Sequence, residues 1–190
     1  MRLARFFLIF FTILYSFLLF ILSFQEETIR LFIRITADFS VFLFLLSFSA
    51  SAINMILKNR ISKFLLSYRN QFGISFAISH LFHLLFIATY ASMNPTVFFE
   101  NRSFIVFLLG GTTYLFIIAM LFTSFTRFRK MLSNKSWKRL HTIGSYLILL
   151  VFLNSFMGRV TESAFYFSTT VVILIVLFLR VFYTIKRYKK

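Results

Sequence analysis

Hydrophobic residues along the chain fall into six long runs separated by short polar segments. Each run is close to or above the roughly 20 apolar residues that an α-helix needs to cross a bilayer. The pattern therefore predicts an all-α, polytopic membrane protein, a six-transmembrane-helix bundle forming a single transmembrane domain over residues 1–190. The predicted helices cover residues 6–24, 29–57, 71–91, 103–125, 140–157 and 164–183.

Charged residues divide the connecting segments into two sets. Sixteen of the 21 Lys and Arg residues lie at the N-terminus, in the loops after the second and fourth runs, and in the C-terminal tail, whereas four of the five acidic residues lie in the other loops. Positively charged loops stay on the cytoplasmic side of a membrane. We therefore expect both termini to be cytoplasmic, in a bacterial inner (plasma) membrane. The first run has no small-residue cleavage site in its SFQEE flank and is expected to be a retained span.

Composition narrows the classes of function. The chain is 59% hydrophobic with a net charge of +16, which suits lipid contact and cytoplasmic anionic lipid rather than nucleic acid. Cysteine is absent, which excludes thiolate catalysis and iron–sulfur ligation by Cys. No GxGxxG, P-loop or HExxH motif occurs, so the sequence predicts no nicotinamide or flavin site.

Three histidines are the candidate ligands of a cofactor. His80 and His83 are three residues apart on the third run, so they share a helix face, roughly 14 and 18 Å deep in the membrane. His141 stands at the start of the fifth run, beside Trp137, a residue type that marks membrane interfaces. Ionisable residues inside a membrane are functional candidates, here as axial ligands of a haem iron. The alternative for each is a hydrogen bond to a neighbouring helix.

The expected depths do not pair these histidines. His141 should lie roughly 12–16 Å from the level of His80 and His83. The residue of the fifth run that is level with His83 is Asn154, and an Asn side chain is a poor iron ligand.

Other polar residues have alternative interpretations. Asp38 is the only acidic residue inside a predicted span, and Arg34 lies four residues earlier on the same face. They could form an intramembrane ion pair, or Asp38 could serve a proton or substrate route. Lys138 and Arg139 are candidates for contact with haem propionates or with a docking partner.

Two stretches resemble the signatures of the ferric reductase-like transmembrane superfamily. Arg69-Asn-Gln-Phe-Gly73, followed by His83, resembles the "R-R-x-L-G-L … H" entry to its haem helix. Leu121-Phe-Thr-Ser124 together with Trp137-Lys-Arg-Leu-His141 … Tyr146 resembles its "L-T-S … W-x-x-L-H-R-x-x-Y" signature. The similarity covers residues 66–158 and is closest to a little-described bacterial branch.

The superfamily includes the haem-binding membrane subunit of the periplasmic methionine sulfoxide reductase system. The resemblance implies a haem b bundle that passes electrons across the membrane, with His83 matching the third-helix ligand and His141 the first fifth-helix His. That subunit has a second His thirteen residues after the first, and the corresponding residue here is Asn154.

We therefore expect one haem b, held by His80 or His83, with His141 at a second site or in contact with a redox partner. A cytoplasmic or membrane donor would reduce the haem, and an acceptor on the outer side would take the electron. No catalytic residue is predicted, so oxidoreductase activity would require such partners. Two alternatives stay open: a cofactor-free scaffold or partner subunit that has kept the fold, which Asn154 favours, and a proton-coupled carrier that uses Asp38.

Overall fold

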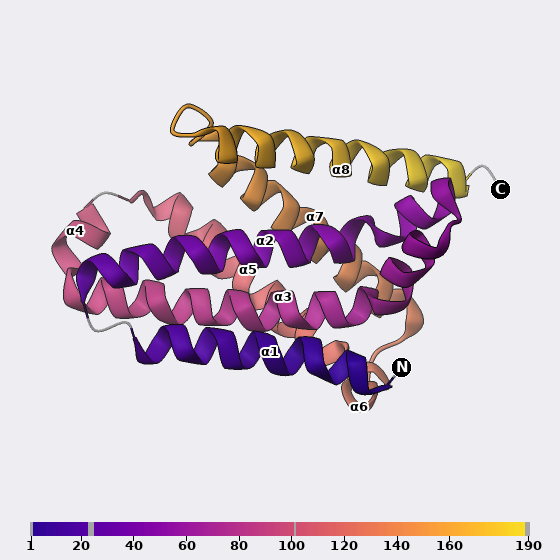
Figure 1. Cartoon of the computed structure of the whole chain (residues 1–190), viewed down its shortest axis with the longest axis horizontal. Coiled ribbons are helices and arrows are strands. Elements are labelled where there is room, and N and C mark those ends of the chain that lie inside the picture. The colour runs from indigo at the N-terminus through magenta and orange to yellow at the C-terminus, as the bar shows by residue number, and fades with distance from the viewer. Residues whose placement is uncertain (1, 23–24, 101, 189–190) are drawn as a thin grey trace.

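The computed structural model describes residues 2–22, 25–100 and 102–188, which form a bundle of long helices (Figure 1). Figure 1 shows α8, α2, α3 and α1 stacked across the view, with α5 and α7 behind them. The long helices are α1 (Arg2–Ile21), α2 (Glu26–Leu57), α3 (Arg60–Met93), α5 (Phe104–Thr123), α7 (Asn134–Met157) and α8 (Ala164–Tyr188), and the short ones are α4 (Pro95–Glu100) and α6 (Thr126–Arg129).

The all-helical membrane architecture predicted from the hydrophobic runs is confirmed. Among the described residues, five helices are long and apolar enough to cross a membrane, namely α2, α3, α5, α7 and α8. The apolar part of α1, Phe6–Ile21, is shorter. Each predicted run thus corresponds to one helix.

Two helices, α3 and α7, begin six or more residues earlier than the hydrophobic runs indicate, because capping residues in polar segments start them. Asn59 accepts a hydrogen bond from the backbone N–H of Ser62 and starts α3. Ser133 accepts one from Ser136 and starts α7. Side-chain oxygens at this position satisfy backbone donors that a helix leaves unpaired. His141 consequently lies about two turns inside α7 rather than at its start.

The loops and helix termini lie at two opposite ends of the bundle. Figure 1 shows the start of α1, the α2–α3 turn, α6 and the end of α8 at one end, which we call the basic end. The start of α2, α4 and the α7–α8 loop lie at the opposite end. The positive-inside rule predicts that the basic end faces the cytoplasm.

Aromatic side chains fill the centre of the bundle. Phe44 of α2 packs against Phe76 of α3 and Phe152 of α7, with ring centroids 5.2 and 5.7 Å apart. These rings are buried together with Ile148 and Leu149. Because aromatic rings bury large apolar areas, this cluster joins α2, α3 and α7.

Glycine allows a close helix approach at one place in the bundle core. A Cβ added to Gly144 of α7 would lie 2.4 Å from the sulfur of Met120 and 3.0 Å from Cδ1 of Phe116, both on α5. The Gly110-Gly111 pair is the more conspicuous signal of a close approach in the sequence. Nothing lies within 4 Å of a Cβ added at either.

Candidate functional site

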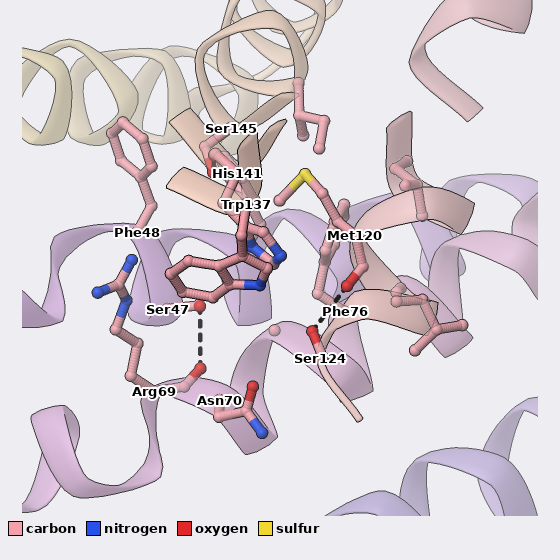
Figure 2. Close-up of a pocket in the computed structure, with 16 residues that line it drawn as sticks. Ser47, Phe48, Arg69, Asn70, Phe76, Met120, Ser124, Trp137, His141 and Ser145 are labelled. Atoms are coloured by element: carbon pink, nitrogen blue, oxygen red, sulfur yellow. Dashed lines mark hydrogen bonds between the residues drawn. The ribbon is translucent and has the colours of Figure 1, made fainter. Parts of the chain in front are cut away.

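A cavity of about 190 Å³ lies between α2, α3, α5 and α7 near the basic end (Figure 2). Of the three histidines, His141 alone lines it. The other polar residues of its wall are Ser47, Arg69, Asn70, Ser124 and Ser145. This volume is below the roughly 300–1,000 Å³ of typical ligand pockets.

Small residues on α3 keep this space open. Asn70, Gly73 and Ala77 all line the cavity, and their spacing of three and four residues places them on one helix face. A Cβ added at Gly73 would lie 3.2 Å from the hydroxyl of Ser47, so α2 and α3 are close together at this level. A larger residue at this position would displace Ser47.

His141 is fixed by two contacts near the basic end. Its ring packs against that of Trp137 at a tilt of 36°, with centroids 4.4 Å apart, and its Nε2 lies 3.0 Å from the hydroxyl of Thr123. That hydroxyl is also 2.7 Å from the carbonyl of Ala119, and a hydroxyl has one proton to donate. If Thr123 donates to Ala119, it accepts from Nε2–H of His141, and Nδ1 then carries the free lone pair.

One arginine lines the cavity, and a second lies over one of the aromatic rings of its wall. Arg69 lines it and donates to Ser51 at 3.1 Å. Arg180 of α8 lies over the ring of Phe48, 5.1 Å from its centroid, and acts electrostatically on Arg69. Nε and Nη1 of Arg180 are buried and have no hydrogen-bond partner among the described residues. The guanidinium also lies over the ring of Tyr183, but buried N–H donors without a hydrogen-bond partner are unfavourable, so this location favours an anionic group.

Arg180 was not recognised from the sequence, although it is the one cation inside the sixth hydrophobic run. Lys138 and Arg139, which the sequence suggested as propionate partners, are exposed and are not among the residues that line the cavity. Their exposure suits the other expectation, contact with a docking partner.

His80 lies farther from the basic end, in the aromatic core. It is buried, and its ring is 5.2 Å from that of Tyr114 and 5.3 Å from that of Phe152. Its Nδ1 lies 2.9 Å from the hydroxyl of Ser40. The hydrogen bond and the packing account for His80 without a ligand.

His83 is held by α2. Its Nδ1 lies 2.9 Å from the carbonyl of Ile33 and 3.2 Å from the hydroxyl of Thr36. A carbonyl only accepts, so Nδ1 carries the proton, and Nε2 keeps its lone pair. Its ring stacks on that of His80, with centroids 5.0 Å apart.

The structure keeps the histidines at two levels, as the depth argument predicts. His80 contacts Phe152, which is eleven residues after His141, or about 16 Å along α7. Asn154 is exposed and does not face the core, since two residues rotate a helix by about 200° from Phe152. The position that carries the second His in the methionine sulfoxide reductase subunit thus points outward here.

Asp38 and Arg34 do not form a close ion pair. Within the described residues, the ion pairs of 4.0 Å or less are Glu26–Arg30 and Arg159–Glu162. Arg159, from the α7–α8 loop, acts on Asp38 more strongly than Arg34 does. The described residues also contain no group of three or more His, Cys, Asp or Glu that could hold a metal ion.

Comparison with known proteins defines the class. Residues 32–153 match the family described as the ferric reductase like transmembrane component. This match covers more than half of the chain and contains His80, His83 and His141. The chain therefore belongs to the ferric reductase-like transmembrane family, which supports a role as a membrane electron-transfer domain. No curated protein and no solved structure matches the chain.

Proposed function

We propose that the protein is a haem b-binding membrane electron-transfer domain and that its haem lies in the cavity beside His141. The observation that carries this proposal is a cavity whose wall holds the imidazole of His141 and the guanidinium group of Arg69. A second guanidinium group, that of Arg180, lies over the ring of Phe48, which also lines the cavity. Haem b has an iron that an imidazole can ligate and two carboxylates that guanidinium groups can bind. The donor set fits one axial ligand and the propionates.

The size of the cavity sets a condition on this proposal. At about 190 Å³ it is smaller than a haem, so the side chains that line it must move apart on binding. Met120 is the most adaptable of them, because its thioether chain is unbranched and flexible.

The protein residues would bind, orient and shield the group. His141 would supply one nitrogen to the iron, either Nδ1 in the tautomer described above or Nε2 once its hydrogen bond with Thr123 is given up. Arg69 and Arg180 would hold the carboxylates, while the core rings exclude water from one side. When bound, haem supplies one-electron chemistry at its iron.

The proposal also includes an electron donor and an electron acceptor, one at each end of the bundle. A donor at the basic end would meet exposed cations there, Lys138 and Arg139 among them, and an acceptor at the opposite end would take the electron. Haem at the level of His80 and His83 is the less favoured arrangement, because Tyr114 and Phe152 fill the space beside His80.

A cofactor-free scaffold is the second candidate function. It is favoured by the single histidine of the cavity wall and by the outward position of Asn154. Such a protein would use the bundle as a partner subunit, and its cavity would stay small.

Absorbance spectroscopy of the purified protein separates these candidates. A dithionite-reduced minus oxidised spectrum, with a pyridine haemochrome assay, should show near-stoichiometric haem b. His141→Ala should abolish the signal, whereas His83→Ala should retain it. If His83→Ala lost the haem signal and His141→Ala kept it, the haem would lie at the level of His80 and His83 instead. A colourless protein, even after expression with added haem, would establish the scaffold.

A further inference from the structure

A second pocket lies at the end of the bundle opposite the basic end. It has a volume of about 430 Å³ and is lined by Tyr90 and by four arginines from three parts of the chain, Arg30 and Arg34 of α2, Arg102 before α5 and Arg159 after α7. Figure 1 shows the start of α2, α4 and the α7–α8 loop gathered at this end. No carboxylate is among the residues that line the pocket.

These four arginines lie at the end of the bundle where the chain otherwise has few cations. Only five of the 21 Lys and Arg residues lie outside the N-terminus, the two basic loops and the tail, and four of those five line this pocket. Membrane proteins disfavour Lys and Arg on the side opposite the basic loops. Glu26 pairs with Arg30 and Glu162 with Arg159, and Asp38 interacts electrostatically with Arg34 and Arg159. Four cations against three carboxylates still leave a positive charge at the pocket, which favours an anion.

Contacts behind the pocket hold two of the guanidinium groups in place. Arg30 donates to Glu26, at 2.9 and 3.1 Å, and to the hydroxyl of Tyr90. Arg159 donates to Glu162 at 2.9 Å. This hydrogen bond lowers the pKa of Glu162 and raises that of Arg159. Both cations are thus fixed by carboxylates that do not line the pocket.

The other two arginines retain free donors. Arg102 uses Nη1 to donate to the carbonyl of Phe98 at 2.9 Å, with its guanidinium 4.1 Å from the centroid of the Phe98 ring. Arg34 is exposed and has no hydrogen bond or close ion pair within the described residues. An arginine offers five N–H donors in a planar fork, which suits the paired oxygens of a phosphate or carboxylate.

We propose that this pocket binds an anion through its phosphate or carboxylate oxygens. Arg30 and Arg159 form a fixed base, and Arg34 and Arg102 supply the donors that close on the ligand. The oxyanion belongs either to a small soluble molecule or to a lipid headgroup. The site shares no residue with the cavity beside His141, so it does not depend on haem.

Isothermal titration of the detergent-purified full chain with pyrophosphate, at constant ionic strength, tests the soluble source. We expect saturable binding that Arg34→Gln and Arg102→Gln each weaken about tenfold, the loss of one charge-assisted contact. Arg127→Gln is the matched control, since Arg127 is exposed in α6 at the basic end, and it should leave binding unchanged. Thermal melting of each variant establishes that it is folded.

Native mass spectrometry tests the lipid source, after reconstitution with phosphatidylglycerol or phosphatidylcholine. Retention of phosphatidylglycerol that Arg34→Gln and Arg102→Gln reduce, and Arg127→Gln does not, would assign a headgroup. Pyrophosphate binding with that same pattern would assign a soluble anion. Equal behaviour of Arg34→Gln, Arg127→Gln and the wild type in both experiments would overturn the proposal.

Discussion

Substitution of Gly144 by alanine should destabilise the bundle, because α5 and α7 meet at this glycine. The added Cβ would lie 2.4 Å from the sulfur of Met120 and 3.0 Å from Phe116, whereas ordinary contact begins at 3.4 Å. About 1 Å of space is therefore missing on the Met120 side. Overpacking of this kind typically costs about 1–3 kcal/mol in the free energy of unfolding. Movement of Met120 can relieve part of this cost, but Met120 also lines the cavity beside His141.

Thermal melting of the detergent-purified protein measures the effect. For a chain of this size, about 1 kcal/mol changes the melting temperature by about 2–4 °C, so Gly144→Ala should melt about 2–12 °C below Gly110→Ala, which has the same gain in helix propensity without the contact. Gly110→Ala is the control, because nothing lies within 4 Å of its Cβ and alanine favours a helix over glycine. It should not lower the melting temperature.

A double variant tests the cause. Met120→Ala removes the atoms that clash, so it should offset much of the effect of Gly144→Ala, and the two changes should be non-additive. If Gly144→Ala melted at the same temperature as Gly110→Ala and the wild type, the close approach of α5 and α7 would be refuted.

Three further predictions concern buried and exposed polar groups. Arg180→Met should leave the haem-free protein equally stable or stabilise it by up to about 3 kcal/mol, because it removes two buried N–H donors that lack hydrogen-bond partners, and a clearly lower melting temperature would contradict this. Ser40→Ala should destabilise by about 1–3 kcal/mol, because it leaves Nδ1–H of His80 without a partner, and an unchanged melting temperature would argue against that hydrogen bond. The pKa of Glu162 is below its ordinary value of 4.5, so the stabilisation from its pair with Arg159 is complete above that pH and is lost as the pH falls below it. The melting temperatures of the wild type and Glu162→Gln should differ at neutral pH and converge in acid, and a difference that persists in acid would assign it to another cause.

The sequence was sufficient for the membrane bundle but not for the limits of its helices. Hydrophobic runs locate the lipid-crossing part of a helix, and α3 and α7 continue beyond it into polar segments. Their starts depend on the side chains of Asn59 and Ser133, which cap backbone donors. Such a cap involves only about four residues, so hydropathy averaged over a membrane-length window does not detect it.

The candidate site was predicted only in part. His141 was correctly placed at a level apart from His80, since rise per residue is fixed along a helix. Rotation about the helix axis was harder to foresee, and Asn154 points outward for that reason. Arg180 was missed because its burial beside Phe48 depends on α2 and α8 packing together, and packing between helices distant in sequence is not encoded in either segment alone.

The α2–α3 hairpin is longer than the membrane is thick. With 32 and 34 residues, α2 and α3 measure about 48 and 51 Å, whereas the hydrocarbon core is about 30 Å thick. Even a tilt of about 40°, the upper end of the usual range, leaves part of each helix outside. The cations at the hairpin tip, Lys58 and Arg60 among them, favour water over lipid, so we expect the tip to protrude at the basic end, and the same unbroken helix carries Asn70 and Gly73 in the cavity wall. A protein that binds the tip and moves it would therefore also move the cavity wall, because α3 runs without a break from one to the other.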